Sequence, residues 1–123
     1  MAGKLLLLIE DLIFVAKVRE TAKALGIELA AGNTRLSGAD VATVQPQAIL
    51  IDLNPSQPAI LEWIRALKTD PTTREIPMVA FASHVQSELI ARARAAGCDR
   101  VLARSAFSQQ LPALLRELSA KDQ

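Results

Sequence analysis

Short apolar runs alternate along this chain with longer segments in which apolar residues recur every three or four positions. The runs at 4–9 and 48–52 are continuously apolar, which is typical of strands covered on both faces by other elements. The alternation predicts an α/β fold, a doubly wound (βα)5 arrangement in which right-handed crossovers join the strands of one parallel sheet. The predicted strands are 4–9, 27–31, 48–52, 78–82 and 101–103, and the predicted helices are 12–25, 38–45, 59–68, 85–96 and 109–118.

The length of 123 residues allows one domain with a substantial core and is too short for two. We therefore expect a single domain over residues 1–123, with no output domain in this chain. Hydrophobic residues make up 50% of the sequence and charged residues 22%, which is the composition of a globular protein. Aromatic residues account for only 3% and tyrosine is absent, so the core must be mainly aliphatic.

The charge pattern excludes several classes of function. Fourteen basic and thirteen acidic residues leave a formal charge of +1, and no segment combines clustered Lys and Arg with aromatics as nucleic-acid surfaces do. The N-terminal apolar run is too short for a signal sequence or a membrane span. We expect a cytoplasmic protein that binds neither nucleic acid nor membrane. The single cysteine, Cys98, has no partner for an internal disulfide and is expected to be a small buried side chain.

Acidic residues stand at the ends of two apolar runs. Asp52 closes the run 48–52, and Glu10 and Asp11 follow the run 4–9. In open parallel sheets, ligands bind beyond the carboxyl ends of the strands, where the strand order reverses. If the order is 2-1-3-4-5, the first and third strands flank that point and the three carboxylates share one crevice, which suits a cation or a phosphoryl group. The alternative is that these acids only cap helices and face water.

Several stretches together resemble the receiver domains of bacterial response regulators, the chemotaxis-receiver type. The paired acids Glu10 and Asp11 match the family's acids after its first strand, and Asp52 matches its phosphoacceptor aspartate. Residues 76–81 are similar to the family's fourth strand, and residues 95–99 to the turn before its fifth. The resemblance covers nearly the whole chain and implies a five-stranded parallel sheet in the order 2-1-3-4-5.

The resemblance also implies a function and a set of site residues. Asp52 would accept a phosphoryl group from a sensor histidine kinase or a phosphotransfer protein in two-component signal transduction. Weakly bound Mg²⁺ would be held by Glu10, Asp11, Asp52 and the backbone carbonyl of Asn54, since Mg²⁺ prefers oxygen ligands. The chain would not be an enzyme in the usual sense, because its only chemistry would be its own phosphorylation and dephosphorylation.

Other positions depart from the family. Ala82 stands where the family has a hydroxyl residue, Val101 replaces its switch aromatic, and Arg104 replaces its lysine. Ser83 could supply the missing hydroxyl only if the fourth strand has already ended, because successive strand residues point to opposite faces. These departures predict an atypical receiver whose conformational response to phosphorylation is weakened.

Two alternatives remain open for Arg104. Its positive charge could serve a bound phosphoryl group, or it could form a salt bridge with Asp52 or Glu10 that neutralises the pocket permanently. Separately, Ala82, Val101 and the altered loop after Asn54 leave open a degenerate receiver, a phosphorylation-independent interaction module that could form a homodimer through the face of the fourth helix, fifth strand and fifth helix. A nucleotide- or flavin-binding fold is less favoured, because no glycine-rich loop follows the first strand. His84, the single histidine, is expected to be an ordinary loop residue.

Overall fold

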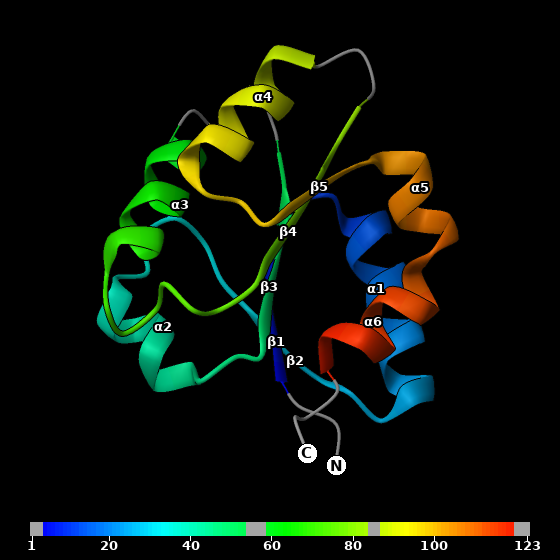
Figure 1. Ribbon diagram of the computed structural model, residues 1–123. Coiled ribbons are helices and arrows are strands. Elements are labelled where there is room, and N and C mark those ends of the chain that lie inside the picture. The colour runs from blue at the N-terminus through cyan, green and yellow to red at the C-terminus, as the bar shows by residue number, and fades with distance from the viewer. Residues whose placement is uncertain (1–3, 54–58, 84–86, 120–123) are drawn as a thin grey trace.

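The structure is a computed structural model that describes residues 4–53, 59–83 and 87–119. Its strands form one parallel sheet in the order β2-β1-β3-β4-β5, which confirms the predicted topology (Figure 1). The order reverses between β1 and β3, so the carboxyl ends of these two strands flank the switch point. The strands are β1 Lys4–Leu8, β2 Glu28–Ala31, β3 Ala48–Asp52, β4 Met78–Ala82 and β5 Arg100–Ala103.

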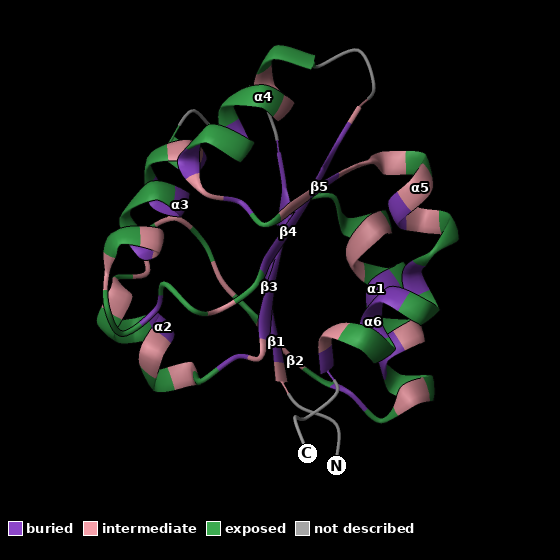
Figure 2. Cartoon of the chain, in the orientation of Figure 1, coloured by how far each residue is buried: buried purple, intermediate pink, exposed green. Residues whose placement is uncertain are grey.

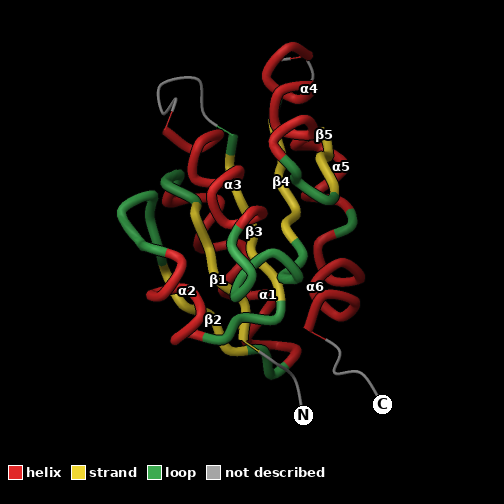
Figure 3. The backbone as a smooth tube through the Cα atoms, turned by 60° about the vertical axis from the view of Figure 1, so that its left-hand side comes forward, coloured by secondary structure: helices red, strands yellow, loops and turns green. Residues whose placement is uncertain are grey.

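Helices cover both faces of the sheet. In Figure 1, α1, α5 and α6 lie on one side and α2, α3 and α4 on the other, and the view turned by 60° shows the strands as one layer between them (Figure 3). No helix of the described residues is both long and apolar enough to cross a membrane. The helices are α1 Leu12–Leu25, α2 Gly38–Val44, α3 Ala59–Thr69, α4 Ser87–Ala96, α5 Arg104–Gln109 and α6 Leu111–Ser119.

The continuously apolar strands are buried on both faces, as their sequence predicts (Figure 2). Along β1, Leu6 and Leu8 join the core that packs under α3, whereas Leu5 and Leu7 join the core under α1 and α6. Alternate residues of one strand therefore serve two separate hydrophobic layers, because successive side chains point to opposite faces.

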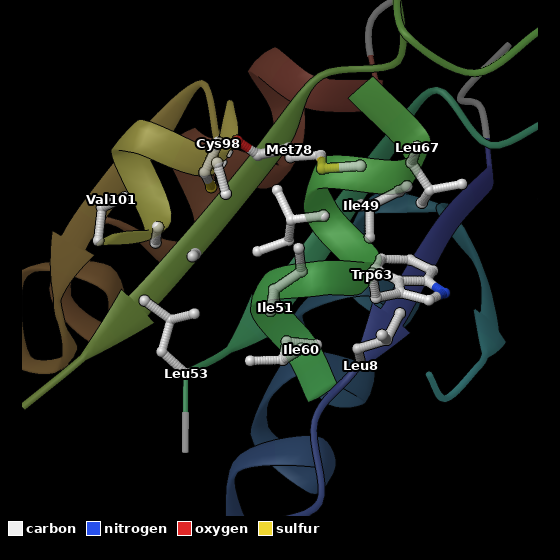
Figure 4. Packing of buried hydrophobic residues seen from close by; sticks show 14 of the residues in the cluster. Leu8, Ile49, Ile51, Leu53, Ile60, Trp63, Leu67, Met78, Cys98 and Val101 are labelled. Atoms are coloured by element: carbon white, nitrogen blue, oxygen red, sulfur yellow. Dashed lines mark hydrogen bonds between the residues drawn. The ribbon is translucent and has the colours of Figure 1, made fainter. Parts of the chain in front are cut away.

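The core on the α3 side contains the single tryptophan. Figure 4 shows Trp63 beside Leu8 and Leu67, and its indole Nε1 donates a hydrogen bond of 3.0 Å to the carbonyl of Leu36. Cys98 lies in the same layer, as predicted, and burial raises the pKa of its thiol to about 11. A thiol with so high a pKa is unreactive at neutral pH, so Cys98 has a packing role.

Most predicted element boundaries are correct to within two residues, and the helix predicted at 12–25 is confirmed at both ends. Gly26 ends α1 in the left-handed conformation with φ of 72°. The helix predicted at 85–96 is described from Ser87 onward, because residues 84–86 lie outside the described segments.

The C-terminal region differs from the prediction of one helix at 109–118. The structure has a short helix, α5, directly after β5, and then a second helix, α6. Pro112 lies in the first turn of α6 and cannot donate a backbone hydrogen bond, so a continuous helix through this point is disfavoured. The short helix escaped prediction because Ala103 at its N-cap makes no side-chain capping bond and six residues are too few for a periodic apolar stripe.

Candidate functional site

Asp52 is the last residue of β3 and is only 7% exposed. Its strand pairs with β1 through Leu8 and Ile51, so the segment that follows β1 lies beside the end of β3. Asp11 belongs to that segment and is the N-cap of α1. The sheet therefore brings Asp52 and Asp11 to one edge, as the strand order predicts.

Arg104 contacts both of these carboxylates. It is the first residue of α5, directly after β5, and its Nη2 lies 3.1 Å from Asp52 Oδ1. Its Nη1 lies 3.6 Å from Asp11 Oδ2. Of the two alternatives for Arg104, the structure thus has the ion pair with Asp52. The second carboxylate that Arg104 contacts belongs to Asp11, not to Glu10. Glu10 is exposed.

Asp11 has a second role as a helix cap. Its Oδ1 accepts hydrogen bonds from the backbone N–H groups of Ile13 at 3.0 Å and Phe14 at 3.2 Å. These are two of the donors at a helix start that have no partner within the helix. Because Oδ2 faces Arg104, both oxygens of the Asp11 carboxylate are engaged within the protein.

The cap predicts different effects for two substitutions of Asp11. Asp11→Ala is expected to lower the free energy of unfolding by about 1 kcal/mol, because the first turn of α1 loses its cap. Asp11→Asn keeps an oxygen that can accept the same hydrogen bonds, and it should lower stability much less. Urea denaturation of both variants measures the difference. Equal destabilisation would show that the cap is not the stabilising contact.

All three phenylalanines of the chain gather beside Arg104. The rings of Phe14 and Phe81 stack at a centroid distance of 4.7 Å, and those of Phe81 and Phe107 at 4.4 Å. The Arg104 Cζ atom lies 5.6 Å from the centroid of Phe14 and 5.4 Å from that of Phe81, within the range of cation–π attraction. Sequence reasoning missed this support, although Phe81 pairs with Asp52 in the sheet register and the predicted strand order brings these two strands together.

Burial and charge act in opposite directions on Asp52. Burial raises the pKa of its carboxyl above the ordinary value of 3.8, and the nearby carboxylates of Asp11 and Glu10 raise it further. The positive charge of Arg104 lowers it, but by less than burial raises it. Ionised Asp52 therefore lowers the stability of the folded protein relative to protonated Asp52. Arg104 makes this loss smaller.

The described residues do not form a complete metal site as they are arranged. Within residues 4–53, 59–83 and 87–119, no group of three His, Cys, Asp or Glu side chains could hold a metal ion. Asn54, the fourth predicted ligand, lies outside these segments, and so does His84. The predicted magnesium site of Glu10, Asp11, Asp52 and Asn54 therefore stays a prediction.

The positions that depart from the receiver pattern are buried or lie at a strand end. Ala82 is fully buried as the last residue of β4, and Ser83 follows beyond the end of the strand. The condition under which Ser83 could replace the missing hydroxyl is thus met. Val101 is 8% exposed and belongs to the core on the α3 side, where Figure 4 shows it.

Comparison with known proteins identifies the fold. No family model matches the chain, and no curated protein matches it significantly. Among solved structures, the chemotaxis response regulator CheY4 of Vibrio cholerae has a TM-score of 0.76 and 18% sequence identity, over 96% of this chain and 99% of that one. The chain has the receiver fold.

Two further receiver structures are similar to this chain in fold. The phosphorylated cyanobacterial phytochrome response regulator RcpA has a TM-score of 0.71 at 19% identity, over 96% of this chain and 91% of that one. The receiver domain of a sensor histidine kinase from Pseudomonas aeruginosa has a TM-score of 0.74 at 15% identity, over 98% of this chain and 100% of that one. That receiver domain has a magnesium ion coordinated in its active-site cleft.

Proposed function

We propose that this chain is a receiver module of two-component signal transduction in the cytoplasm, with Asp52 as its phosphoacceptor. The donor is a sensor histidine kinase or a phosphotransfer protein. The observation that carries the proposal is the position of Asp52, a buried carboxylate at the carboxyl end of β3 beside the switch point of a receiver fold, paired with a cation at 3.1 Å. A signalling role of this kind needs no catalytic turnover of an external substrate.

The proposed step is a phosphoryl transfer between two side chains. An oxygen of the Asp52 carboxylate attacks the phosphorus of a phosphohistidine, a P–O bond forms, and the P–N bond breaks. The imidazole leaves with the electron pair of that bond and takes up a proton, and Asp52 becomes an acyl phosphate. Such a transfer requires mainly in-line positioning and neutralisation of charge. Arg104 supplies a positive charge at the position where the negative charge of the phosphoryl group increases.

Intact-mass measurement after incubation with acetyl phosphate in magnesium-containing buffer tests the phosphoacceptor. The wild-type protein is expected to gain the mass of one phosphoryl group, and Asp52→Asn should gain none. Glu62→Gln is a matched control, because Glu62 is an exposed acid on α3 and should not affect labelling. Labelling that persists in Asp52→Asn would show that another residue is the acceptor.

The surface beside the site fits a protein donor. Leu12 and Ile13 follow Asp11 at the start of α1 and are 81% and 84% exposed, and they are the exposed large hydrophobic residues of the described segments. Because they are adjacent, these two side chains form a contiguous exposed apolar surface, the kind of surface that can mark a contact site for a partner. We propose that the donor protein packs on these two side chains while it presents its phosphohistidine to Asp52.

The double variant Leu12→Ser/Ile13→Ser tests this contact. It should slow phosphoryl transfer from the histidine-containing donor about tenfold or more, because apolar contacts at the centre of an interface carry much of its binding energy. Labelling by acetyl phosphate should stay at the wild-type rate, since this small donor does not need the surface. Equal loss with both donors would mean that the variant damages the site itself.

The second candidate function is a degenerate receiver that acts by constitutive binding. The ion pair between Arg104 and Asp52 favours it, because a permanently neutralised aspartate is a weaker nucleophile. Ala82 and Val101 also lack the groups with which a receiver responds to phosphorylation. This candidate predicts no mass gain with acetyl phosphate, and it includes a homodimer through the face of α4, β5 and α6, which sedimentation of the wild-type protein would detect.

A further inference from the structure

We infer that the guanidinium of Arg104 takes the place of a divalent cation in the acidic site, so that the wild-type protein excludes Mg²⁺ and Mn²⁺ from Asp52. The acidic cluster and the receiver fold lead one to expect a metal here. The arrangement of the described residues does not fit one. The inference about metal exclusion stands on the geometry of Arg104 and does not require that Asp52 be phosphorylated.

The first argument is that three carboxylate oxygens of the site, one of Asp52 and both of Asp11, are already engaged. Arg104 contacts Asp52 Oδ1 at 3.1 Å and Asp11 Oδ2 at 3.6 Å, and Asp11 Oδ1 caps α1. A magnesium ion requires short contacts to oxygens in near-octahedral geometry. It could approach these carboxylates only if the guanidinium moved away, because two cations at this distance repel each other strongly in a partly buried pocket.

The second argument is that Arg104 is held in place from two directions. The Arg104 Cζ atom lies within cation–π range of Phe14 and Phe81, two rings that stack on each other, and Phe107 stacks on Phe81 in turn. Arginine is suited to such a position, because its planar group can stack on aromatic rings while its N–H groups point at carboxylates. Arg104 is 40% exposed, and its charged end contacts two carboxylates and lies near two aromatic rings.

The third argument concerns how the charges balance. Asp52 is buried, and buried acidic side chains are normally paired with an opposite charge, here that of Arg104 at 3.1 Å. In this chain the partner is covalently part of the protein and is always charged. A consequence for signalling, which rests on the proposed function, is that phosphoryl transfer to Asp52 would depend on Arg104 and be indifferent to divalent cations.

Titration with manganese, followed by electron paramagnetic resonance of the free ion, tests the inference on the full chain. The wild-type protein should show no saturable binding at millimolar manganese. Arg104→Met removes the charge and should bind manganese about tenfold more tightly or better, because a competing cation has gone. Adding Asp52→Asn to that variant should abolish the binding. Circular dichroism checks that each variant is folded.

Arg100→Met is the matched control. Arg100 pairs with Glu117 at 3.1 Å and is 39% exposed, close to the values for Arg104, but it lies at the opposite end of β5. This variant should bind manganese no better than the wild type. Saturable binding to the wild-type protein that Asp52→Asn removes would overturn the inference, whether or not Arg104→Met folds. Absence of binding to a folded Arg104→Met would overturn it as well, because the carboxylates would then form no metal site for Arg104 to fill.

Discussion

Phe81→Ala is expected to lower the free energy of unfolding by about 3 to 5 kcal/mol, the usual range for deleting a fully buried phenylalanine. Phe81 is completely buried on β4 and stacks on Phe14 and Phe107, so its removal leaves a cavity between α1, α5 and the sheet. It also removes one of the two rings that hold Arg104. Urea denaturation followed by far-ultraviolet circular dichroism measures the change.

Phe81→Leu serves as the companion variant. Leucine keeps most of the apolar volume, so the loss of stability should be clearly smaller than for alanine, whereas the ring contact with Arg104 is lost in both variants. Comparison of the two separates packing from cation–π attraction. A loss below about 1 kcal/mol for Phe81→Ala would contradict the close packing of the aromatic stack.

Asp52→Asn is expected to stabilise the protein at pH 7, because it replaces a buried acidic side chain by a neutral one of similar shape. The physical reason is burial, which raises the pKa of Asp52 above 3.8 and makes its ionised form unfavourable in the folded state. The amide oxygen of asparagine can still accept a hydrogen bond from Arg104, so the geometry of the pocket is largely kept.

The stabilisation by Asp52→Asn should depend on pH with a defined sign. Because the folded-state pKa of Asp52 is raised, the protonated side chain favours the folded protein over the unfolded one. This contribution to the free energy of unfolding is fully present below about pH 3.8, the ordinary pKa of an aspartate. It is lost as the pH rises through the raised folded-state pKa. The advantage of the asparagine variant should therefore be largest at neutral pH and vanish as the pH falls toward 4. Free energies of unfolding of both proteins across this range measure it.

Asp70→Asn provides a control of opposite sign. Hydrogen bonds from the backbone N–H and hydroxyl of Thr72 lower the pKa of Asp70, so its ionised form is favoured in the folded protein. Replacing Asp70 should not raise stability at pH 7. Stabilisation by both substitutions would indicate a general effect of removing negative charge, and it would contradict the specific role of burial at Asp52.

The fold was predictable because three strands, β1, β3 and β4, lie in continuous apolar runs, and acids mark the ends of the first two. Asp52 closes such a run, and the parallel order then brings Asp11 beside it. The split between α5 and α6 was not predictable from periodicity, because the first of these helices has six residues and no capping side chain.

The approach of Asp11 to Asp52 was predictable from the strand order, and the contacts of Arg104 were less so. The pairing of Arg104 with Asp52 was one of two open alternatives, and nothing in the sequence favoured Asp11 over Glu10 as its second partner. That choice depends on the cap of α1, which fixes the direction of the Asp11 carboxylate. The gathering of Phe14, Phe81 and Phe107 depends on contacts between elements far apart in sequence, which local patterns do not report.

We infer that Arg104 supplies the positive charge of a phosphoacceptor site in place of a metal ion. The most direct test is the rate at which acetyl phosphate labels Asp52 in the presence of a strong chelator. The wild-type protein is expected to gain one phosphoryl group by intact mass at the same rate in EDTA as in magnesium. Arg104→Met should be labelled only when magnesium is present, since a metal can then supply the missing charge. Labelling of the wild-type protein that requires magnesium and stops in EDTA would contradict the assignment of Arg104 as the cation of the site.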